Sequence, residues 1–215
     1  MAITAASRTN IIELNVLAGN GAPGTTGLGA LVATFDISGI AGVAASITTS
    51  ASWTAKFPSF QTPEEFGKEF LELIVPGLSA AGMAEGITII AGLINSGSSQ
   101  ADVLLASSNF LSATSVTDAA FGDYAAKFQN QTAVAVFHTV EQEKASPRAL
   151  DDITSDAATI VTARADIDGS AAAAQKVIDD AAAAAKAAAD AKAAADAKAA
   201  ADAKAAADAK AAADA

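Results

Sequence analysis

Hydrophobic residues recur along the first 168 residues at the spacing of one face of a helix. In the clearest set they stand at i, i+3, i+4 and i+7, at Leu28, Leu31, Val32 and Phe35. Nowhere do β-branched residues alternate with polar ones over the length of a strand. The pattern predicts an all-α fold, with seven or eight short helices in a compact domain that we call the head (residues 1–168).

Residues that cap helices precede most of these hydrophobic sets. Thr62 followed by Pro63 predicts the clearest helix start, because threonine caps well and proline suits the first helical position, which needs no N–H donor. Ser99, with Asp102 three residues later, predicts another. The same reasoning gives further expected starts at Asn10, at Thr25 or Thr26, at Thr117 and at Ser146–Pro147.

The inward positions of these helices predict a single hydrophobic core. Its expected members are Leu31, Phe35, Phe66, Phe70, Ile87, Ile90, Val103, Phe121, Phe128 and Val136. A second group of large side chains, Trp53, Phe57 and Phe60, surrounds Pro58 and predicts a hydrophobic hinge between helices.

Residues 169–215 differ sharply from the head. Gly169 interrupts the helical pattern, and residues 171–215 contain 29 alanines among 45 residues. A Lys-Ala-Ala-Ala-Asp-Ala motif repeats there with period six, so its charged pairs spiral around a helix and leave no heptad seam. We expect an alanine-rich helical stalk that would be about 68 Å long at the standard rise per residue.

Charge and composition exclude several classes of function. The chain has 24 acidic and 13 basic residues and a net charge of −11, which opposes attachment to nucleic acid and to anionic lipid. It has no cysteine, which excludes thiol chemistry. The first residues lack the pattern of a signal peptide, and no apolar run of membrane-spanning length stands out. We therefore expect a soluble protein that does not span a membrane.

Three patterns suggest chemistry only weakly. Residues 19–26 place glycines as in a phosphate-binding loop but carry Thr25 where that loop needs lysine, so we interpret them as a turn between helices. His138 is the single histidine, with Glu141 one turn further on, and lacks the partners that a catalytic or zinc site requires. No serine lies in a nucleophile elbow. We expect no enzymatic activity.

The acidic end of the head is the one candidate metal site. Asp166 and Asp168 precede Gly169 in a pattern that resembles the start of a calcium loop. Val177 stands where an EF-hand would supply its bidentate glutamate. We expect the acids to cap a helix break, and name Asp166 and Asp168 as weak calcium candidates, with no other cofactor.

Three segments carry a resemblance to a known family: SRTNIIELNVLAGNGAPG (7–24), FPSFQTPEEFGKEFLELIVPGL (57–78) and FGDYAAKFQNQTAVAVFHTVE (121–141). They resemble the N-terminal helical region of bacterial RTX-type surface-layer and related surface proteins. A fourth segment, GLINSGSSQADVLLASSNF (92–110), resembles the small helical modules of unknown function that recur in such type I-secreted proteins. The resemblance covers about residues 7–165. It implies a non-enzymatic extracellular domain at the bacterial cell surface that contacts lipopolysaccharide or neighbouring copies of itself.

The C-terminal part departs from that family. Its members usually continue into glycine- and aspartate-rich calcium-binding β-rolls, whereas residues 171–215 are similar in composition to the periplasm-spanning helix of TolA-like proteins. We expect a surface-layer or filament subunit whose head drives self-assembly, with any calcium acting on assembly. The alternative is a head that binds surface glycan or lipopolysaccharide in a groove lined by Trp53 and Tyr124.

Overall fold

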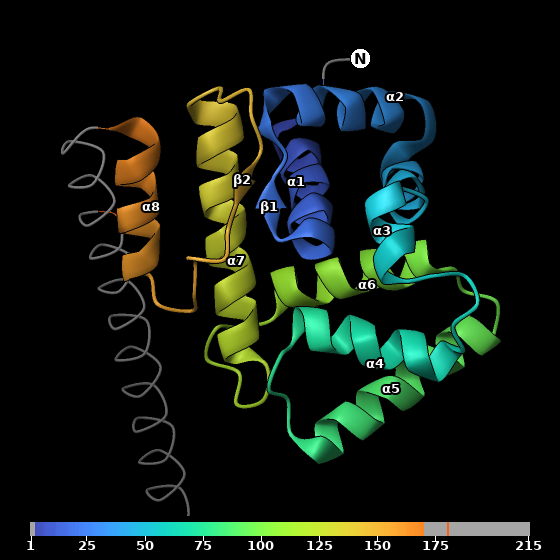
Figure 1. Ribbon diagram of the computed structural model, residues 1–215. Coiled ribbons are helices and arrows are strands. Elements are labelled where there is room, and N and C mark those ends of the chain that lie inside the picture. The colour runs from blue at the N-terminus through green and yellow to red at the C-terminus, as the bar shows by residue number, and fades with distance from the viewer. Residues whose placement is uncertain (1–2, 170–179, 181–215) are drawn as a thin grey trace, which may run out of the picture. The chain divides into compact units, whose positions relative to one another are not determined.

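The computed structural model describes residues 3–169 and Asp180. This part of the chain contains eight α-helices, one π-helix and two very short strands, which confirms the predicted all-α class (Figure 1). The elements are α1 (Ala5–Gly19), β1 (Gly21–Ala22), α2 (Gly24–Thr48), α3 (Ala51–Lys56), α4 (Pro63–Ile74), α5 (Ala80–Asn95), α6 (Gln100–Ala113), α7 (Gly122–Val136), η1 (Phe137–Glu141), β2 (Arg148–Ala149) and α8 (Ala158–Asp168).

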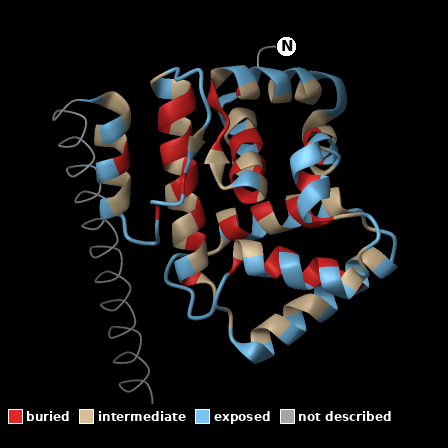
Figure 2. Ribbon diagram, in the orientation of Figure 1, coloured by how far each residue is buried: buried red, intermediate tan, exposed pale blue. Residues whose placement is uncertain are grey.

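Helix α1 forms the centre of the head. It packs against α2, α6 and α7, and Figure 2 shows that buried residues concentrate on α1 and α7. Five of its side chains are buried: Ile11, Ile12, Leu14, Val16 and Leu17. A helix covered on several sides needs apolar residues on more than one face, which explains why α1 has no single hydrophobic stripe.

An aromatic cluster joins α3 to α4. The Trp53 and Phe57 rings are 4.5 Å apart, and Phe57 meets Phe66 edge to face at 5.4 Å. Phe66 stacks on Phe70 at 5.5 Å, and the indole N–H of Trp53 donates a 2.6 Å hydrogen bond to Gln100 Oε1. Part of the predicted hinge is wrong, because Phe60 is 85% exposed and stays outside this cluster.

The predicted helix starts at Thr62 and Ser99 are confirmed, and each is a capping box. The Thr62 hydroxyl accepts from the Glu65 N–H while the Glu65 carboxylate accepts from the Thr62 N–H. Ser99 and Asp102 make the same reciprocal pair at the start of α6. Each box satisfies two backbone donors that a helix terminus would otherwise leave unpaired.

Two predicted starts in the N-terminal part are wrong. Helix α1 begins at Ala5, where the Thr4 hydroxyl accepts from the Ser7 N–H, so Asn10 lies inside the helix. Helix α2 begins at Gly24 after Pro23 and has no side-chain cap, although Thr25 and Thr26 follow. Instead, the Thr25 N–H donates to the Lys144 carbonyl across the fold. A tertiary contact therefore supplies the acceptor that the sequence pattern assigned to a local side chain.

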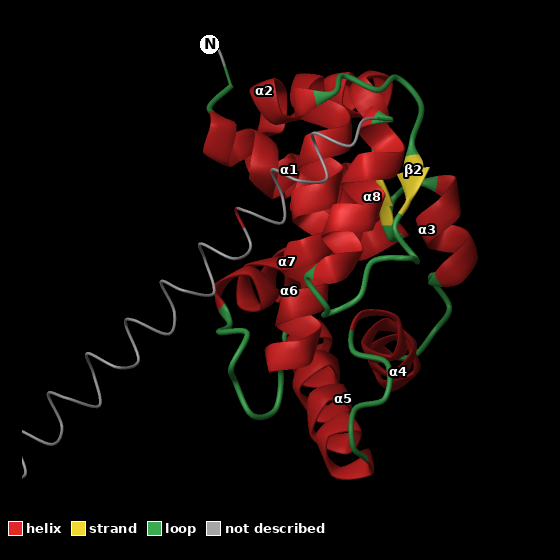
Figure 3. Cartoon of the chain, turned by 90° about the vertical axis from the view of Figure 1, so that its left-hand side faces the viewer, coloured by secondary structure: helices red, strands yellow, loops and turns green. Residues whose placement is uncertain are grey.

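The other two corrections fall in the C-terminal part of the head. Ser146–Pro147 opens no helix: Arg148–Ala149 forms β2 and pairs antiparallel with β1, as Figure 3 shows, and the next helix begins at Ala158. Helix α7 begins at Gly122 rather than at Thr117, because the Asp118 carboxylate accepts from the N–H groups of Ala120 and Phe121.

The hydrophobic core is larger than predicted, and its centre lies elsewhere. Of the ten expected members, Phe66, Phe70, Ile90, Val103 and Phe128 are buried. Leu31, Phe35, Ile87, Phe121 and Val136 are partly buried and pack against the core. The fully buried side chains of α1, α6 and the segment after β2 include Ile11, Ile12, Leu104, Leu111, Leu150 and Ile153.

Helix α2 corrects the expectation about membrane-spanning length. By length and composition α2 is apolar enough to cross a membrane, and Asp36 is its only charged residue. Gly39 breaks it, with φ 66° and ψ −168°. Residues 24–38 would extend about 22 Å at the helical rise, less than the roughly 30 Å core of a bilayer.

The chain divides into two compact units, Met1–Gly169 and Ser170–Ala215. This division lies one residue from the predicted boundary between residues 168 and 169. Helix α8 ends there because Gly169 adopts a left-handed conformation, φ 67°, and its N–H donates to the Ala165 carbonyl. The predicted alanine-rich stalk lies outside the described residues, apart from Asp180.

Candidate functional site

An open cavity of about 510 Å³, with both apolar and charged side chains on its wall, lies where α1, α6, α7, η1 and α8 meet. We call it the Arg164 cavity. Glu13 from α1, Glu141 from η1 and Arg164 from α8 line it, together with Gln129 and Thr132 from α7. Because these residues come from four separate helices, no local spacing in the sequence pointed to the cavity.

Arg164 is held by an aromatic ring rather than by an ion pair. Its guanidinium carbon lies 4.8 Å from the centre of the Phe137 ring, in a cation–π contact. Within the described part of the chain it makes no salt bridge or side-chain hydrogen bond, and its Nε is buried without a partner. The contact with Phe137 orients the guanidinium and leaves its N–H groups unused by the fold.

Glu13 is a half-buried carboxyl in the same cavity. The Ser112 hydroxyl donates a 2.5 Å hydrogen bond to Glu13 Oε1. Burial raises the pKa of Glu13, and the hydrogen bond from Ser112 opposes that rise only in part. No motif in the sequence marks Glu13, because only the packing of α1 against α6 brings it beside Ser112.

A π-helical turn adjoins the cavity. Residues Phe137–Glu141 form η1 directly after α7, and the Gln142 N–H donates to the Phe137 carbonyl at 2.9 Å. The turn buries Phe137 beneath Arg164 and places Glu141 on the rim. π-helical turns occur frequently at functional sites because they displace side chains from the regular helical positions.

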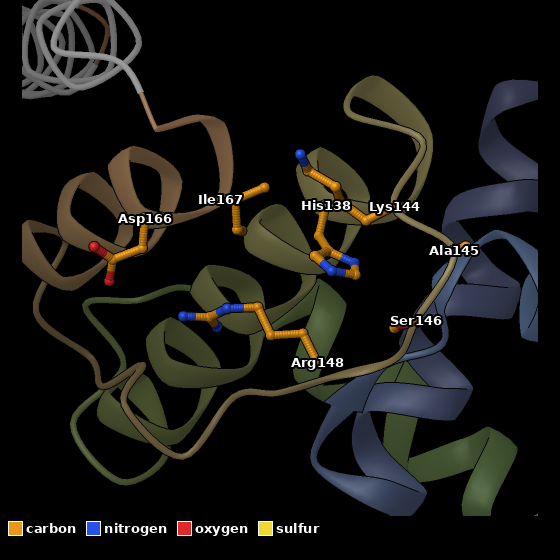
Figure 4. Close-up of a pocket in the computed structure, with 7 residues that line it drawn as sticks. All are labelled: His138, Lys144, Ala145, Ser146, Arg148, Asp166 and Ile167. Atoms are coloured by element: carbon orange, nitrogen blue, oxygen red, sulfur yellow. The ribbon is translucent and has the colours of Figure 1, made fainter.

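A second cavity, of about 380 Å³, surrounds His138 (Figure 4). Lys144 and Arg148 line it from the segment after η1, and Asp166 and Ile167 line it from α8. His138 is only 6% exposed. Burial, and then the positive charges of Arg148 and Lys144, lower the pKa of His138. The imidazole is therefore neutral at neutral pH.

The acidic residues near the end of the head are engaged individually. Asn20 donates to the Asp151 carboxylate, and Arg148 forms a 2.7 Å ion pair with Asp152. Asp156 accepts from the Ala158 N–H at the start of α8. Asp166 lines the His138 cavity, while Asp168 is the last residue of α8.

Among the described residues, the structure brings together no acidic cluster at this end. Within residues 3–169 and at Asp180, no group of three or more histidine or acidic side chains is placed to hold a metal ion. A weak calcium contact at Asp166 and Asp168 stays a prediction.

Two other predicted features have clear positions. Residues 19–26 contain the end of α1, all of β1 and the start of α2, and therefore form a turn between helices. The two aromatic residues of the predicted glycan groove line different cavities, Trp53 one and Tyr124 another. Trp53 is also only 3% exposed, so its face is not open for stacking on a sugar.

Large apolar side chains lie on the surface of the head. Ile37 of α2 is 86% exposed, and Ile89 of α5 is 57% exposed. The others in this group are Phe60, Leu93, Phe110 and Val116. Single exposed apolar residues are ordinary, and these six are distributed over α2, α5, α6 and two loops.

No family model, no curated protein and no solved structure matches the chain. The resemblance to RTX-type surface proteins and the similarity of residues 171–215 to TolA-like helices therefore stay predictions. The geometry of the described residues carries the functional argument.

Proposed function

We propose that the chain is a non-enzymatic structural subunit of a bacterial surface layer or extracellular filament, and that its head binds other copies of itself. The observation that carries this proposal is the set of large apolar side chains on the surface of the head, among which Ile37 of α2 is 86% exposed and Phe60 is 85% exposed. A surface of this kind gains free energy when a second apolar surface removes it from water. The extracellular location rests on the resemblance of the three segments alone.

Charge opposes this association and makes it adjustable. Residues 1–170 carry 17 acidic against 7 basic side chains, so two heads repel each other at low ionic strength. Salt screens that repulsion over about 10 Å at 0.1 M, and a divalent cation neutralises it locally. We expect assembly to increase with salt and with calcium, while the fold of the head is little affected by either.

Light scattering after size-exclusion chromatography tests the proposal. The full chain should form oligomers or polymers that grow with protein concentration and with salt. Replacement of Ile37 by serine should weaken them, whereas Ser38→Ala, at the neighbouring exposed position, should not. A wild-type protein that stays monomeric at every salt and calcium concentration would show that the head is not an assembly element.

The same measurement distinguishes this proposal from the alternative, in which the head binds surface glycan or lipopolysaccharide. Such a protein should be a monomer that binds vesicles containing lipopolysaccharide. Trp53 and Tyr124 line different cavities, so a glycan reader of this kind would need another groove.

A further inference from the structure

We propose that the Arg164 cavity binds a small zwitterion, of the class of a free aliphatic α-amino acid, with its carboxylate on Arg164 and its ammonium group on Glu13 and Glu141. This inference does not rest on the proposed assembly function. A monomer that binds the ligand would contradict assembly alone, and an oligomer that does not bind it would contradict this site alone.

The carboxylate contact follows from the state of Arg164. A guanidinium carries five N–H donors in a planar fork that matches a carboxylate. In the part of the chain that the structure describes, none of these donors is taken up by a side chain or a backbone carbonyl, and the contact with the Phe137 ring already fixes the position of the guanidinium carbon. The side chain is thus oriented before a ligand arrives, which lowers the entropic cost of binding.

The ammonium contact follows from the two carboxylates on the same cavity. Glu13 Oε1 accepts from Ser112, and this hydrogen bond holds the side chain in position. Glu141 is exposed on the rim, and neither glutamate lies within ion-pair distance of Arg164. The cavity therefore keeps one positive and two negative groups apart, and a ligand with both charges can lie between them.

The charge arrangement selects against simpler ligands. A plain anion meets Glu13 and Glu141, and a plain cation meets Arg164. A neutral sugar gains hydrogen bonds but leaves the charges on both sides without an ionic partner. A zwitterion satisfies both sides, and the Ala133 and Val136 side chains on the cavity wall suit a short aliphatic group. A volume of about 510 Å³ is ample for such a molecule.

The first experiment uses L-leucine and two derivatives, measured by calorimetry on the full chain. N-acetyl-leucine has lost the ammonium charge, and leucine methyl ester has lost the carboxylate. Leucine should bind, and each derivative should bind about tenfold or more weakly, as expected for the loss of a hydrogen bond to a charged group. Equal affinity for all three compounds would overturn the proposal.

The second experiment assigns each contact to its residue. Arg164→Gln should weaken leucine but not the methyl ester, because the ester has no carboxylate to lose. Glu141→Gln, at an exposed site that the fold tolerates, should weaken leucine but not N-acetyl-leucine. Arg164→Lys keeps the positive charge and should bind leucine more tightly than Arg164→Gln does. This difference would show that the loss in Arg164→Gln comes from the missing charge and not from misfolding. Lys127→Gln, in a different cavity, is the matched control and should change nothing.

The pH dependence adds a readout that a structural role would not produce. Glu13 loses its charge as the pH falls through its raised pKa, so leucine affinity should fall there and this step should be absent in Glu13→Gln. The other charged side chains on the cavity are Arg164 and Glu141; α6 and α7 contribute none to it, and α2 does not line it. Tighter binding of glucose than of leucine, or no leucine binding at millimolar concentration, would refute the zwitterion site.

Discussion

Gly24 lies directly against the backbone of Ala145. A Cβ at Gly24 would overlap the Ala145 carbonyl oxygen and would come within 2.7 Å of the Ser146 carbonyl carbon. Its φ of 67° is also in the left-handed region, which side chains rarely adopt. This contact, with the hydrogen bond from Thr25 to Lys144, fixes the start of α2 against the segment that follows η1.

Replacement of Gly24 by alanine should therefore destabilise the head. We expect a loss of about 1 to 3 kcal/mol in the free energy of unfolding, the usual range for a strained backbone position. Gly29→Ala is the matched control, because its Cβ would meet nothing within 4 Å and it lies inside the same helix. That change should stabilise by up to about 1 kcal/mol. Urea titration of both variants measures the difference.

Phe70→Ala should remove the centre of the aromatic cluster. Phe70 is fully buried and contacts the rings of Trp53, Phe57 and Phe66, so we expect a loss of about 3 to 5 kcal/mol. Phe60→Ala, at the exposed phenylalanine nearby, should change stability by less than about 0.5 kcal/mol. Similar losses for the two variants would contradict the packing described for this end of the head.

Thr62→Ala should cost about 1 kcal/mol, because it removes one half of the capping box at α4. Thr26→Ala is the control, because α2 has no side-chain cap and the Thr26 hydroxyl therefore caps no backbone N–H. Its effect should stay within about 0.5 kcal/mol. Thermal unfolding followed by circular dichroism is sufficient to compare them.

His138 should make stability depend on pH in mildly acidic solution. Its pKa is lower in the folded protein than its ordinary value of about 6.5, so the unfolded chain binds more protons between the two values. The free energy of unfolding should therefore fall as the pH drops below about 6.5, and His138→Gln should remove this fall.

The single histidine gives one unambiguous set of imidazole C–H signals in NMR spectra, and their pH titration reports its pKa directly. Lys144→Gln should raise that pKa, because one of the two positive charges that lower it is gone. Lys68→Gln, in α4, should leave it unchanged. A wild-type pKa at or above the ordinary value would contradict the burial of this side chain.

Deletion of residues 170–215 should leave the head folded, because Met1–Gly169 forms its own compact unit. If the head drives assembly, this shortened chain should still associate, with the same dependence on salt. A clean monomer, together with oligomers of the isolated 170–215 peptide, would assign assembly to the C-terminal segment instead.

Local signals in the sequence predicted the fold class and several helix starts correctly. The Thr62 and Ser99 caps depend on contacts three residues apart, which the sequence displays directly. The predicted start at Ser146–Pro147 failed because Arg148–Ala149 pairs with a strand near the N-terminus. Such a pairing is specified by the whole fold and by no neighbouring residue.

The Arg164 cavity was beyond sequence analysis for the same reason. Arg164 and Glu13 each lie on a helix with no distinctive motif, and only the packing of α1, α7 and α8 brings them to one cavity. Exposure was equally hard to infer, because Ile37 and Leu28 belong to the same apolar helix, yet Leu28 is buried and Ile37 is not.

Trp53 makes one end of the molecule optically distinct. It is the only tryptophan in the chain, and it lies buried among Phe57 and Phe70 with its indole N–H bonded to Gln100. Its fluorescence should therefore be emitted at short wavelength in the folded protein and shift to the red when α3 and α4 separate. Tryptophan fluorescence thus reports the unfolding of the α3–α4 region, whereas circular dichroism reports the loss of every helix. Different unfolding midpoints from the two signals would show that the head does not unfold in a single cooperative step.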